Sequence, residues 1–296
     1  MLHELTTEAR NPNSDRIDRL TSLEIVRLMN SEDAKVATAV AEQAEPIARA
    51  IDLIAARIRG GGRLVYQGAG TSGRLGVLDA SECPPTFNTP PHMVVGLIAG
   101  GAGALTRSIE GAEDHPDQGA RDLETVGFSD ADCLVGIATS GRTPYVIGGL
   151  RHARNRGAVT VGLSCNEPSA LASECDVHIM PIVGPEVVSG STRLKAGTAT
   201  KMVLNMLTTG TMVRLGKTFG NLMVDLRATN TKLSERSRRI VSMLTGLSDE
   251  AARHKLAECN GELKTAVVAQ CRSVTAPEAR RLLATAEGHL RRALEV

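Results

Sequence analysis

Hydrophobic and polar positions alternate in blocks through the middle of the chain. Short apolar runs predict strands at 63–67, 93–98, 133–138, 159–163 and 177–180, separated by segments with helical or turn-forming residues. Regular alternation of buried strands and helices is typical of a parallel sheet with helices on both faces. We therefore predict an α/β fold for most of the chain.

Longer helical patterns flank this region. An alanine-rich amphipathic stretch over 31–59 predicts one long helix, with Ser31 as its N-cap, Gly60 after its last residue, and Pro46 kinking or splitting it. A second long helix is expected over 191–215. The polar, turn-rich residues 1–30 are predicted to form an arm that lies over the rest.

After Gly246 the strand patterns stop and three short helical patterns follow. Apolar residues recur in them at helical spacing, at Leu256, Leu263, Val267, Leu282, Leu283 and Leu290. We expect a main domain over 1–245 and a three-helix bundle over 246–296.

The composition narrows the possible partners. The 34 basic and 33 acidic residues give a net charge of +1, so a broad positive surface for nucleic acid or an anionic membrane is not expected. With no Trp, two Tyr and three Phe, the chain has few aromatic side chains on which bases or sugar rings could stack. A sugar ligand would therefore be held by hydrogen bonds and charge.

The chain shows no pattern of export or of metal binding. No apolar run approaches the roughly 20 residues that span a bilayer, and residues 1–4 do not resemble the start of a signal peptide. The six cysteines include no C-x-x-C pair, and the seven histidines include no H-x-x-x-H pair. We expect reduced thiols in a cytoplasm and no metal site.

The tetrapeptide Thr-Ser-Gly-Arg occurs twice, at Thr71–Arg74 and at Thr139–Arg142. Each copy follows a predicted strand and precedes a segment that can be helical. Such a turn presents unpaired N–H groups at the positive end of a helix dipole, where phosphates bind. The two copies predict two loops that grip one phosphorylated ligand through Thr71, Ser72, Gly73, Thr139, Ser140 and Gly141.

The first loop also matches the dinucleotide pattern G-x-G-x-x-G at 68–73. That pattern requires an acid after the second strand to bind a ribose hydroxyl, and residues 99–103 contain none. The adjacent hydroxyls of Thr71 and Ser72 suit a phosphate monoester better. An ordinary glycine-rich helix start is the alternative for either loop alone.

Two acidic segments are candidates for acid–base chemistry. Pro84 and Pro85 should stop the helix that opens near Ser72, which leaves Glu82 near its C-terminal end. In the second segment, Gly111 implies a turn that could aim Glu110 or Glu113 inward. Each acid could equally belong to a solvated surface.

A hydroxyl-rich loop with Ser189 and Ser191 leads into the second long helix. Lys195, about one turn inside that helix, could neutralise a phosphate or a developing enolate. A surface lysine is the alternative.

The longer strings at 68–87, 110–114 and 184–197 resemble those of the N-acetylmuramic acid 6-phosphate etherase family, which carries a sugar isomerase-type domain. The resemblance extends from Asn11 to the helical tail. It implies cleavage of the D-lactyl ether to N-acetylglucosamine 6-phosphate and D-lactate, by elimination and then addition of water. It also implies Glu82 as the acid and Glu113 as the base, although the residues themselves do not separate these roles, and no metal or redox cofactor.

Two other functions share these loops. An aldose–ketose phosphosugar isomerase needs the same phosphate contacts, and so does a non-catalytic phosphosugar-binding regulator. The regulatory protein of glucokinase shares much of the pattern but lacks the string Ser-Glu-Cys-Pro-Pro, which ends here at Pro85. Glu82 therefore favours the etherase.

The position of Glu82 raises a geometric difficulty. At 1.5 Å per residue, a straight helix puts it roughly 15 Å from the phosphate loop at Ser72, which is too far for one hexose phosphate. Either the helix breaks early, for instance at Gly76, or Glu82 serves the site of another subunit. We expect a homodimer with a shared site.

Overall fold

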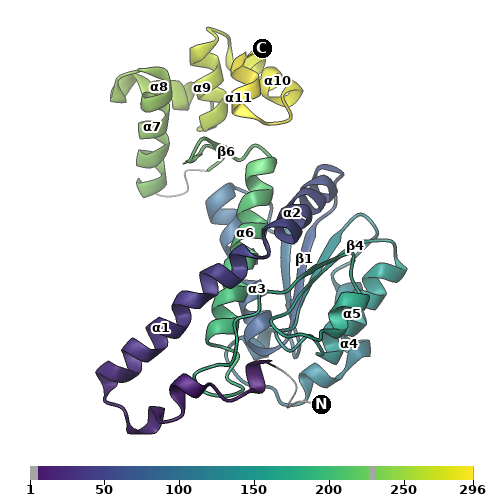
Figure 1. Ribbon diagram of the computed structural model, residues 1–296. Coiled ribbons are helices and arrows are strands. Elements are labelled where there is room, and N and C mark those ends of the chain that lie inside the picture. The colour runs from purple at the N-terminus through teal and green to yellow at the C-terminus, as the bar shows by residue number, and fades with distance from the viewer. Residues whose placement is uncertain (1–5, 227–230, 296) are drawn as a thin grey trace. The chain divides into compact units, whose positions relative to one another are not determined.

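The computed structural model describes residues 6–226 and 231–295, and the chain divides into two compact units. The first unit takes residues 1–81 and 92–210, and the second takes residues 82–91 and 211–296. Two helices, α3 (Gly70–Phe87) and α6 (Lys195–Arg214), begin in the first unit and end in the second. Figure 1 labels the elements.

Five parallel strands form the sheet of the first unit, in the order β2-β1-β3-β4-β5. They are β1 (Leu64–Gly68), β2 (Val94–Ile98), β3 (Cys133–Ile137), β4 (Val159–Leu163) and β5 (Val177–Ile179). The predicted strands are confirmed to within one residue at each end. All residues of β1 and β3 are buried, as expected for central strands covered on both faces.

Helices cover both faces of this sheet, as predicted. On one face, α5 (Pro144–Asn155) packs on β1, β3 and β4, and α4 (Pro116–Thr125) packs on α5. Figure 1 shows α2, α3 and α6 on the other face. Glycines allow the close approach, because a Cβ on Gly76 of α3 would lie 3.0 Å from the Cβ of Tyr66.

A buried carboxylate joins three of these elements. The Oδ2 atom of Asp79 on α3 accepts a hydrogen bond from the hydroxyl of Tyr66 on β1 (2.9 Å). Its Oδ1 atom accepts one from Asn205 on α6 (2.6 Å). Burial raises the pKa of Asp79 despite these bonds, and the carboxylate forms a buried structural link between the three elements.

The N-terminal helices differ from the prediction. There are two, α1 (Ser22–Ala41) and α2 (Ala44–Arg59), and the first begins well before Ser31. Thr21 is the N-cap and forms a capping box with Glu24, whereas the hydroxyl of Ser31 donates to a carbonyl inside α1. The predicted split is confirmed. Pro46 falls in the first turn of α2, where no helical N–H partner is needed.

Two other helix boundaries also correct the prediction. α3 continues through Pro84 and Pro85 to Phe87, because both prolines lie in its last turn, and Asn88 N–H closes that turn on Pro84 O (2.9 Å). α6 begins at Lys195, so this lysine is the first residue of the helix and does not lie one turn inside it.

The second unit contains a small antiparallel pair, β6 (Thr218–Phe219) and β7 (Leu222–Met223), and a set of short helices. The helices are α7 (Thr231–Thr245), α8 (Asp249–Glu258), α9 (Leu263–Cys271), α10 (Ala276–Thr285) and α11 (Leu290–Glu295). After residue 246 there are thus four helices where three were predicted. The six predicted apolar positions all belong to one hydrophobic cluster or pack against it.

The same cluster includes Ile240 and Val241 of α7. The second unit thus takes in residues 82–91 and 211–245 as well as the tail, and the boundary expected after residue 245 stays a prediction. Folding of residues 246–296 as a module of its own stays a prediction. None of the described helices is both long and apolar enough to cross a membrane.

Candidate functional site

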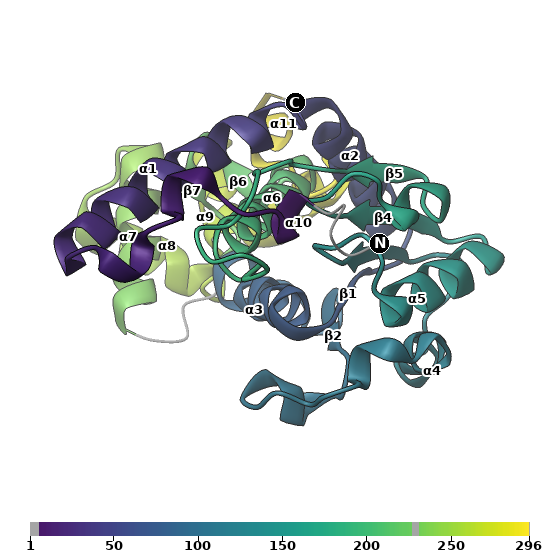
Figure 2. The same cartoon turned by 60° about the horizontal axis from the view of Figure 1, so that its bottom comes forward.

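The carboxyl ends of the parallel strands open into a cleft of about 360 Å³ in the first unit. Ligands of open parallel sheets bind at this edge. Figure 2, in which the lower end of Figure 1 comes forward, shows the ribbon from the side of this edge. The residues that line the cleft come from five chain segments: Thr7 and Glu8; Ala69, Gly70, Thr71 and Ser72; Glu113 and Asp114; Thr139, Ser140, Arg142, Thr143 and Pro144; Gly190 and Thr192.

The first Thr-Ser-Gly-Arg copy forms the opening turn of α3. Gly73 N–H already donates to Ala69 O (3.2 Å), whereas the N–H groups of the residues before it lie ahead of the first helical hydrogen bonds. Gly73 lets the helix begin directly on the strand end, because a Cβ there would lie 2.6 Å from Gly68 O. The hydroxyl oxygens of Ser72 and Thr139 are 3.3 Å apart, so the two copies meet in one place.

The second copy has a different conformation. It forms a tight turn before α5, in which Ser140 Oγ accepts a hydrogen bond from Arg142 N–H (3.3 Å). Gly141 has a φ of +70°, and its N–H donates to Ala138 O (2.7 Å). That N–H is already used within the turn, which leaves the hydroxyls of Thr139 and Ser140 to face a ligand.

The second acidic segment lies beside the first loop. Gly111 has a φ of +73° and starts a short turn, Ala112–Asp114, that brings Glu113 to the wall of the cleft. Glu110 and Glu113 also line a smaller adjoining cavity of about 150 Å³, together with Arg74. Glu110 accepts a hydrogen bond from the hydroxyl of Ser108 (2.9 Å).

Glu82 does not lie in the wall of this cleft. It is exposed on α3, in the segment 82–91 that groups with the second unit, and it is not among the residues that line the cleft. α3 runs through Gly76 without a break, which removes the early helix end considered above.

The loop before α6 contributes its backbone more than its predicted side chains. Gly190 and Thr192 line the cleft, whereas the hydroxyl of Ser189 donates to Glu8 O (2.7 Å). Ser191 is half-buried between them.

Lys195 is neither a surface lysine nor part of the cleft wall. Its side chain is 1% exposed, and its Nζ atom lies 2.7 Å from Glu32 Oε2 in a buried ion pair. Glu186 accepts hydrogen bonds from the first two N–H groups of α6, those of Lys195 and Ala196, each at 3.0 Å. This carboxylate caps the helix, and burial raises its pKa.

Glu32 is the centre of a hydrogen-bond network. Burial alone would raise its pKa, but bonds from Lys195, Lys35, Asn13 and Asn11 outweigh burial and hold the pKa well below its usual range. The network ties α1, α6 and the N-terminal arm together. Sequence reasoning missed it because its members lie up to 163 positions apart.

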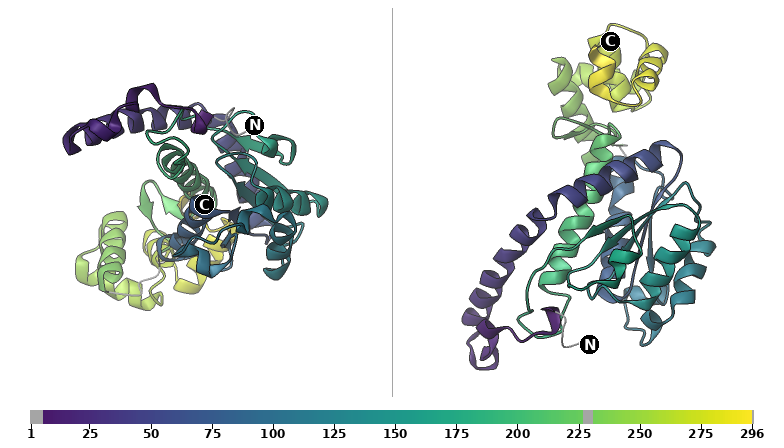
Figure 3. Two further views of the ribbon diagram at one scale, coloured as in Figure 1. Left: turned by 90° about the horizontal axis from the view of Figure 1, so that it is seen from below. Right: turned by 45° about the vertical axis from the view of Figure 1, so that its right-hand side comes forward.

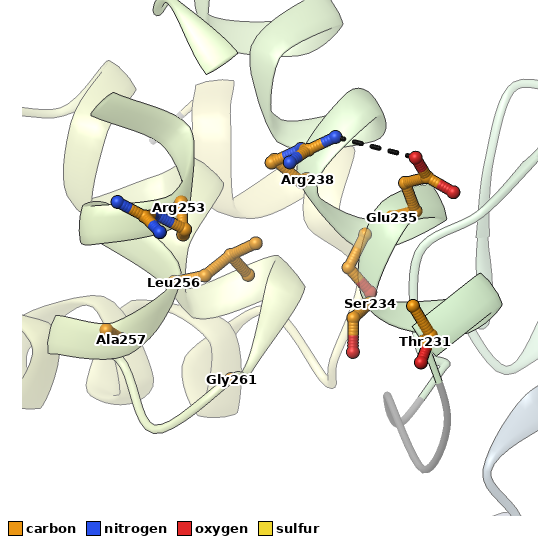
Figure 4. A pocket seen from close by; sticks show the side chains of 9 residues that line it. Thr231, Ser234, Glu235, Arg238, Arg253, Leu256, Ala257 and Gly261 are labelled. Atoms are coloured by element: carbon orange, nitrogen blue, oxygen red, sulfur yellow. Dashed lines mark ion pairs between the residues drawn. The ribbon is translucent and has the colours of Figure 1, made fainter. Parts of the chain in front are cut away.

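A cavity of similar size lies in the second unit, between α7 and α8 (Figure 4). Its volume is about 350 Å³, and Arg238, Arg253 and Leu256 are among its lining residues. Arg238 is already paired with Asp249 (2.8 Å) and Glu235 (3.8 Å). This arginine and the apolar wall make a poorer phosphate site than the hydroxyl loops of the first unit.

The described residues contain no group of three His, Cys, Asp or Glu side chains that could hold a metal ion. All six cysteines are free thiols. The site thus consists of hydroxyls, a helix N-terminus, carboxylates and Arg142.

Comparison with known proteins agrees with this fold. Residues 46–154 match the glucokinase regulatory protein N-terminal SIS domain, and residues 123–210 match the SIS domain. A putative phosphosugar isomerase involved in capsule formation from Bacteroides fragilis has a TM-score of 0.50 and 23% identity, over 66% of this chain and 91% of its own. The fold and the cleft define a SIS-domain protein.

Full-length relatives narrow this class. The chain is 62% identical to N-acetylmuramic acid 6-phosphate etherase of Rhodopirellula baltica, over 99% of this chain and 97% of the relative. It is 59% identical to the etherase of the same name from Streptomyces avermitilis, over 99% and 94%. The chain belongs to the N-acetylmuramic acid 6-phosphate etherase family.

The buried ion pair predicts a large effect of a conservative change. Glu32→Gln leaves the Lys195 charge buried without a counter-charge, which should lower the free energy of unfolding by about 3–5 kcal/mol in urea titrations. Asp33→Asn, at the exposed neighbouring position, is the matched control and should have little effect. Equal stability of the two variants would contradict this account of the network.

The same pair predicts a pH dependence. Because the folded pKa of Glu32 lies below its ordinary value of 4.5, the ionised carboxylate stabilises the fold fully above that pH. This contribution is lost as the pH falls below 4.5 towards the folded pKa. The stability difference between wild type and Glu32→Gln should therefore narrow in urea titrations at successively lower pH, and a difference that widens would be inconsistent with a depressed pKa.

Proposed function

We propose that this protein cleaves the D-lactyl ether of N-acetylmuramic acid 6-phosphate and releases N-acetylglucosamine 6-phosphate and D-lactate, a step in recycling cell-wall sugars. The observation that carries the proposal is the full-length likeness to etherases at up to 62% identity, on a chain with a hydroxyl-lined cleft at its strand ends. A cleft of about 360 Å³ suits a ligand of this size.

The phosphate group is bound where the two loops meet. The N-terminus of α3 supplies N–H groups and the positive end of a dipole, and hydroxyls of Thr71, Ser72, Thr139 and Ser140 converge from both loops. Charge-assisted bonds of this kind contribute roughly 1.5–3 kcal/mol each.

The elimination step needs two proton transfers. In the open-chain sugar, the aldehyde acidifies the proton on C2, and a carboxylate removes it. The C3–O bond then breaks as a carboxylic acid protonates the departing lactate oxygen. Water then adds across the resulting C2–C3 double bond, its hydroxyl going to C3 and a proton returning to C2. We assign Glu113, which lies in the cleft wall, as the base and Glu82 as the acid. Proton transfer alone suffices, so no metal or redox cofactor is included in the proposal.

We further propose that the enzyme is a cytoplasmic homodimer with a site shared between subunits. Glu82 lies ten residues after Ser72 on one unbroken helix, roughly 15 Å along its axis. An apolar groove of about 660 Å³ runs along α2 and α6, with Ile47, Ile51 and Met206 among its lining residues. Leu23 and Val26 of α1 are 58% and 62% exposed, on a helix that extends beyond the sheet in Figure 3. A second copy of the chain would cover these surfaces.

A non-catalytic phosphosugar-binding regulator is the second candidate, because residues 46–154 match the N-terminal SIS domain of glucokinase regulatory protein. Incubation with N-acetylmuramic acid 6-phosphate and an assay for D-lactate distinguishes the candidates. The etherase should release D-lactate. Binding without release would favour the regulator, and conversion between aldose and ketose phosphates would favour an isomerase.

Removal of either carboxylate should slow the reaction. Glu113→Gln and Glu82→Gln should each lower kcat by about 10²–10⁴-fold, because each removes one proton-transfer group, while the fold is kept. Glu45→Gln, on α2, is a matched control and should behave like wild type. Wild-type kcat in Glu113→Gln would remove this residue from the mechanism.

Loss of the hydroxyl loop should act on binding. Ser72 is only 8% exposed at the start of α3. Ser72→Leu replaces its hydroxyl by a bulky aliphatic side chain and should therefore raise KM strongly. An unphosphorylated sugar should be a poor substrate of the wild-type enzyme. Equal turnover of the two sugars would show that the loops do not anchor a phosphate.

The shared site predicts complementation between inactive variants. After subunit exchange, a dimer of one Glu82→Gln chain and one Ser72→Leu chain should contain one intact site, so D-lactate release should return. If both residues served one chain's site, both sites of the mixed dimer would stay defective. Absence of activity after confirmed exchange would reject the shared site and leave the reaction untouched.

A further inference from the structure

The N-terminal arm forms one wall of the cleft. Its first turn, Thr6–Glu8, places Thr7 and Glu8 among the lining residues. Thr7 is only 1% exposed, so the turn is packed into the unit and does not merely lie on its surface. Two different parts of the chain hold it there.

On one side, Asn166 connects the arm to the second hydroxyl loop. Asn166 is fully buried, and its Oδ1 atom accepts a hydrogen bond from Thr7 N–H (3.1 Å). Its Nδ2 atom donates both to Thr7 Oγ1 (3.0 Å) and to Thr139 O (2.9 Å). One amide side chain thus fixes the arm and a phosphate-loop residue relative to each other.

On the other side, the loop before α6 holds the arm backbone. Gly190 N–H donates to Thr7 O (3.0 Å), and the Ser189 hydroxyl donates to Glu8 O (2.7 Å). A Cβ on Gly190 would lie 2.9 Å from Glu8 Oε2. The Glu8 carboxylate therefore lies against bare glycine backbone in the cleft wall.

We propose that Glu8 is a further substrate-contacting residue, and that Thr7 and Asn166 are the positioning residues that hold it. This inference rests on the proposed phosphosugar function. Glu8, Glu113 and Asp114 line the same cleft as the hydroxyl loops. A carboxylate repels the phosphate and lactate anions, and it accepts hydrogen bonds from hydroxyl or amide N–H groups. Glu8 thus binds the hydroxyl or acetamido donors of the sugar and contributes nothing to holding the phosphate.

Two binding probes separate the sugar from the phosphate. Glu8→Gln should weaken binding of N-acetylglucosamine 6-phosphate about tenfold, because the charge-assisted bond to the sugar becomes a neutral one. Binding of inorganic phosphate should stay the same or tighten, because a nearby negative charge is removed. Asp15→Asn, an acid on the same arm that pairs with Arg10 and does not line the cleft, is the matched control.

The positioning role has a test of its own. Thr7→Val removes the hydroxyl and keeps the shape, so amide hydrogen exchange of the arm should accelerate and kcat/KM for D-lactate release should fall about tenfold. Thr7→Ser keeps the hydroxyl and should restore both. Thr6→Val, at the neighbouring position outside the cleft wall, should resemble wild type.

The outcomes distinguish this inference from the proposed reaction. Glu8→Gln binding the sugar phosphate like Asp15→Asn, or losing both probes equally, would overturn the role of Glu8. Failure of Thr7→Ser to restore what Thr7→Val loses would overturn the positioning role. If Glu8→Gln shows the expected difference between the two probes but wild-type protein releases no D-lactate, the etherase reaction is rejected and the contact between Glu8 and the sugar is supported.

Discussion

The buried ion pair between Glu32 and Lys195 is the constraint on which the cleft depends. Burial removes the carboxylate and the ammonium group from water, which costs desolvation free energy. This cost is offset because Asn11, Asn13 and Lys35 complete the hydrogen bonds of Glu32. This network fixes the start of α6 against α1. The loop before α6 then has little freedom, and its Ser189 hydroxyl and Gly190 N–H hold the N-terminal arm at the cleft.

One tetrapeptide performs two structural tasks at this edge. In the first copy, Thr71 and Ser72 belong to a helix that starts directly on β1, so the peptide dipoles contribute. In the second, the same residue types form a turn that uses the Gly141 N–H internally and presents hydroxyls. The cleft thus combines the electrostatic field of a helix dipole, from the first loop, with hydrogen bonds from hydroxyl groups of the second loop. A parallel sheet brings the two together because its central strands end at the same edge.

The parts of the structure that local patterns determine could be predicted, and the rest depends on distant contacts. Strands followed from apolar runs, because a doubly covered sheet buries every residue of β1 and β3. The N-terminal helix began earlier than predicted, since the capping box at Thr21 outweighed the isolated Ser31. Lys195 could not be placed from its neighbours, because the acid that pairs with it is 163 residues away. Asn166 gave no sequence pattern at all, and its two partners, Thr7 and Thr139, lie 159 and 27 residues before it.

The arm has a consequence for synthesis of the chain. The hydrogen-bond partner of Thr7, Asn166, follows it by 159 residues, and the ion-pair partner of Glu32, Lys195, follows it by 163 residues. A ribosome therefore releases the arm and α1 long before the residues that secure them exist. The strands β1 and β3 can pair earlier, but the pocket becomes complete only when about two thirds of the polypeptide has emerged. Truncated products from an interrupted message would hold a nearly finished sheet and a Glu32 without its buried partner Lys195, and such chains are suitable clients for chaperones and proteases.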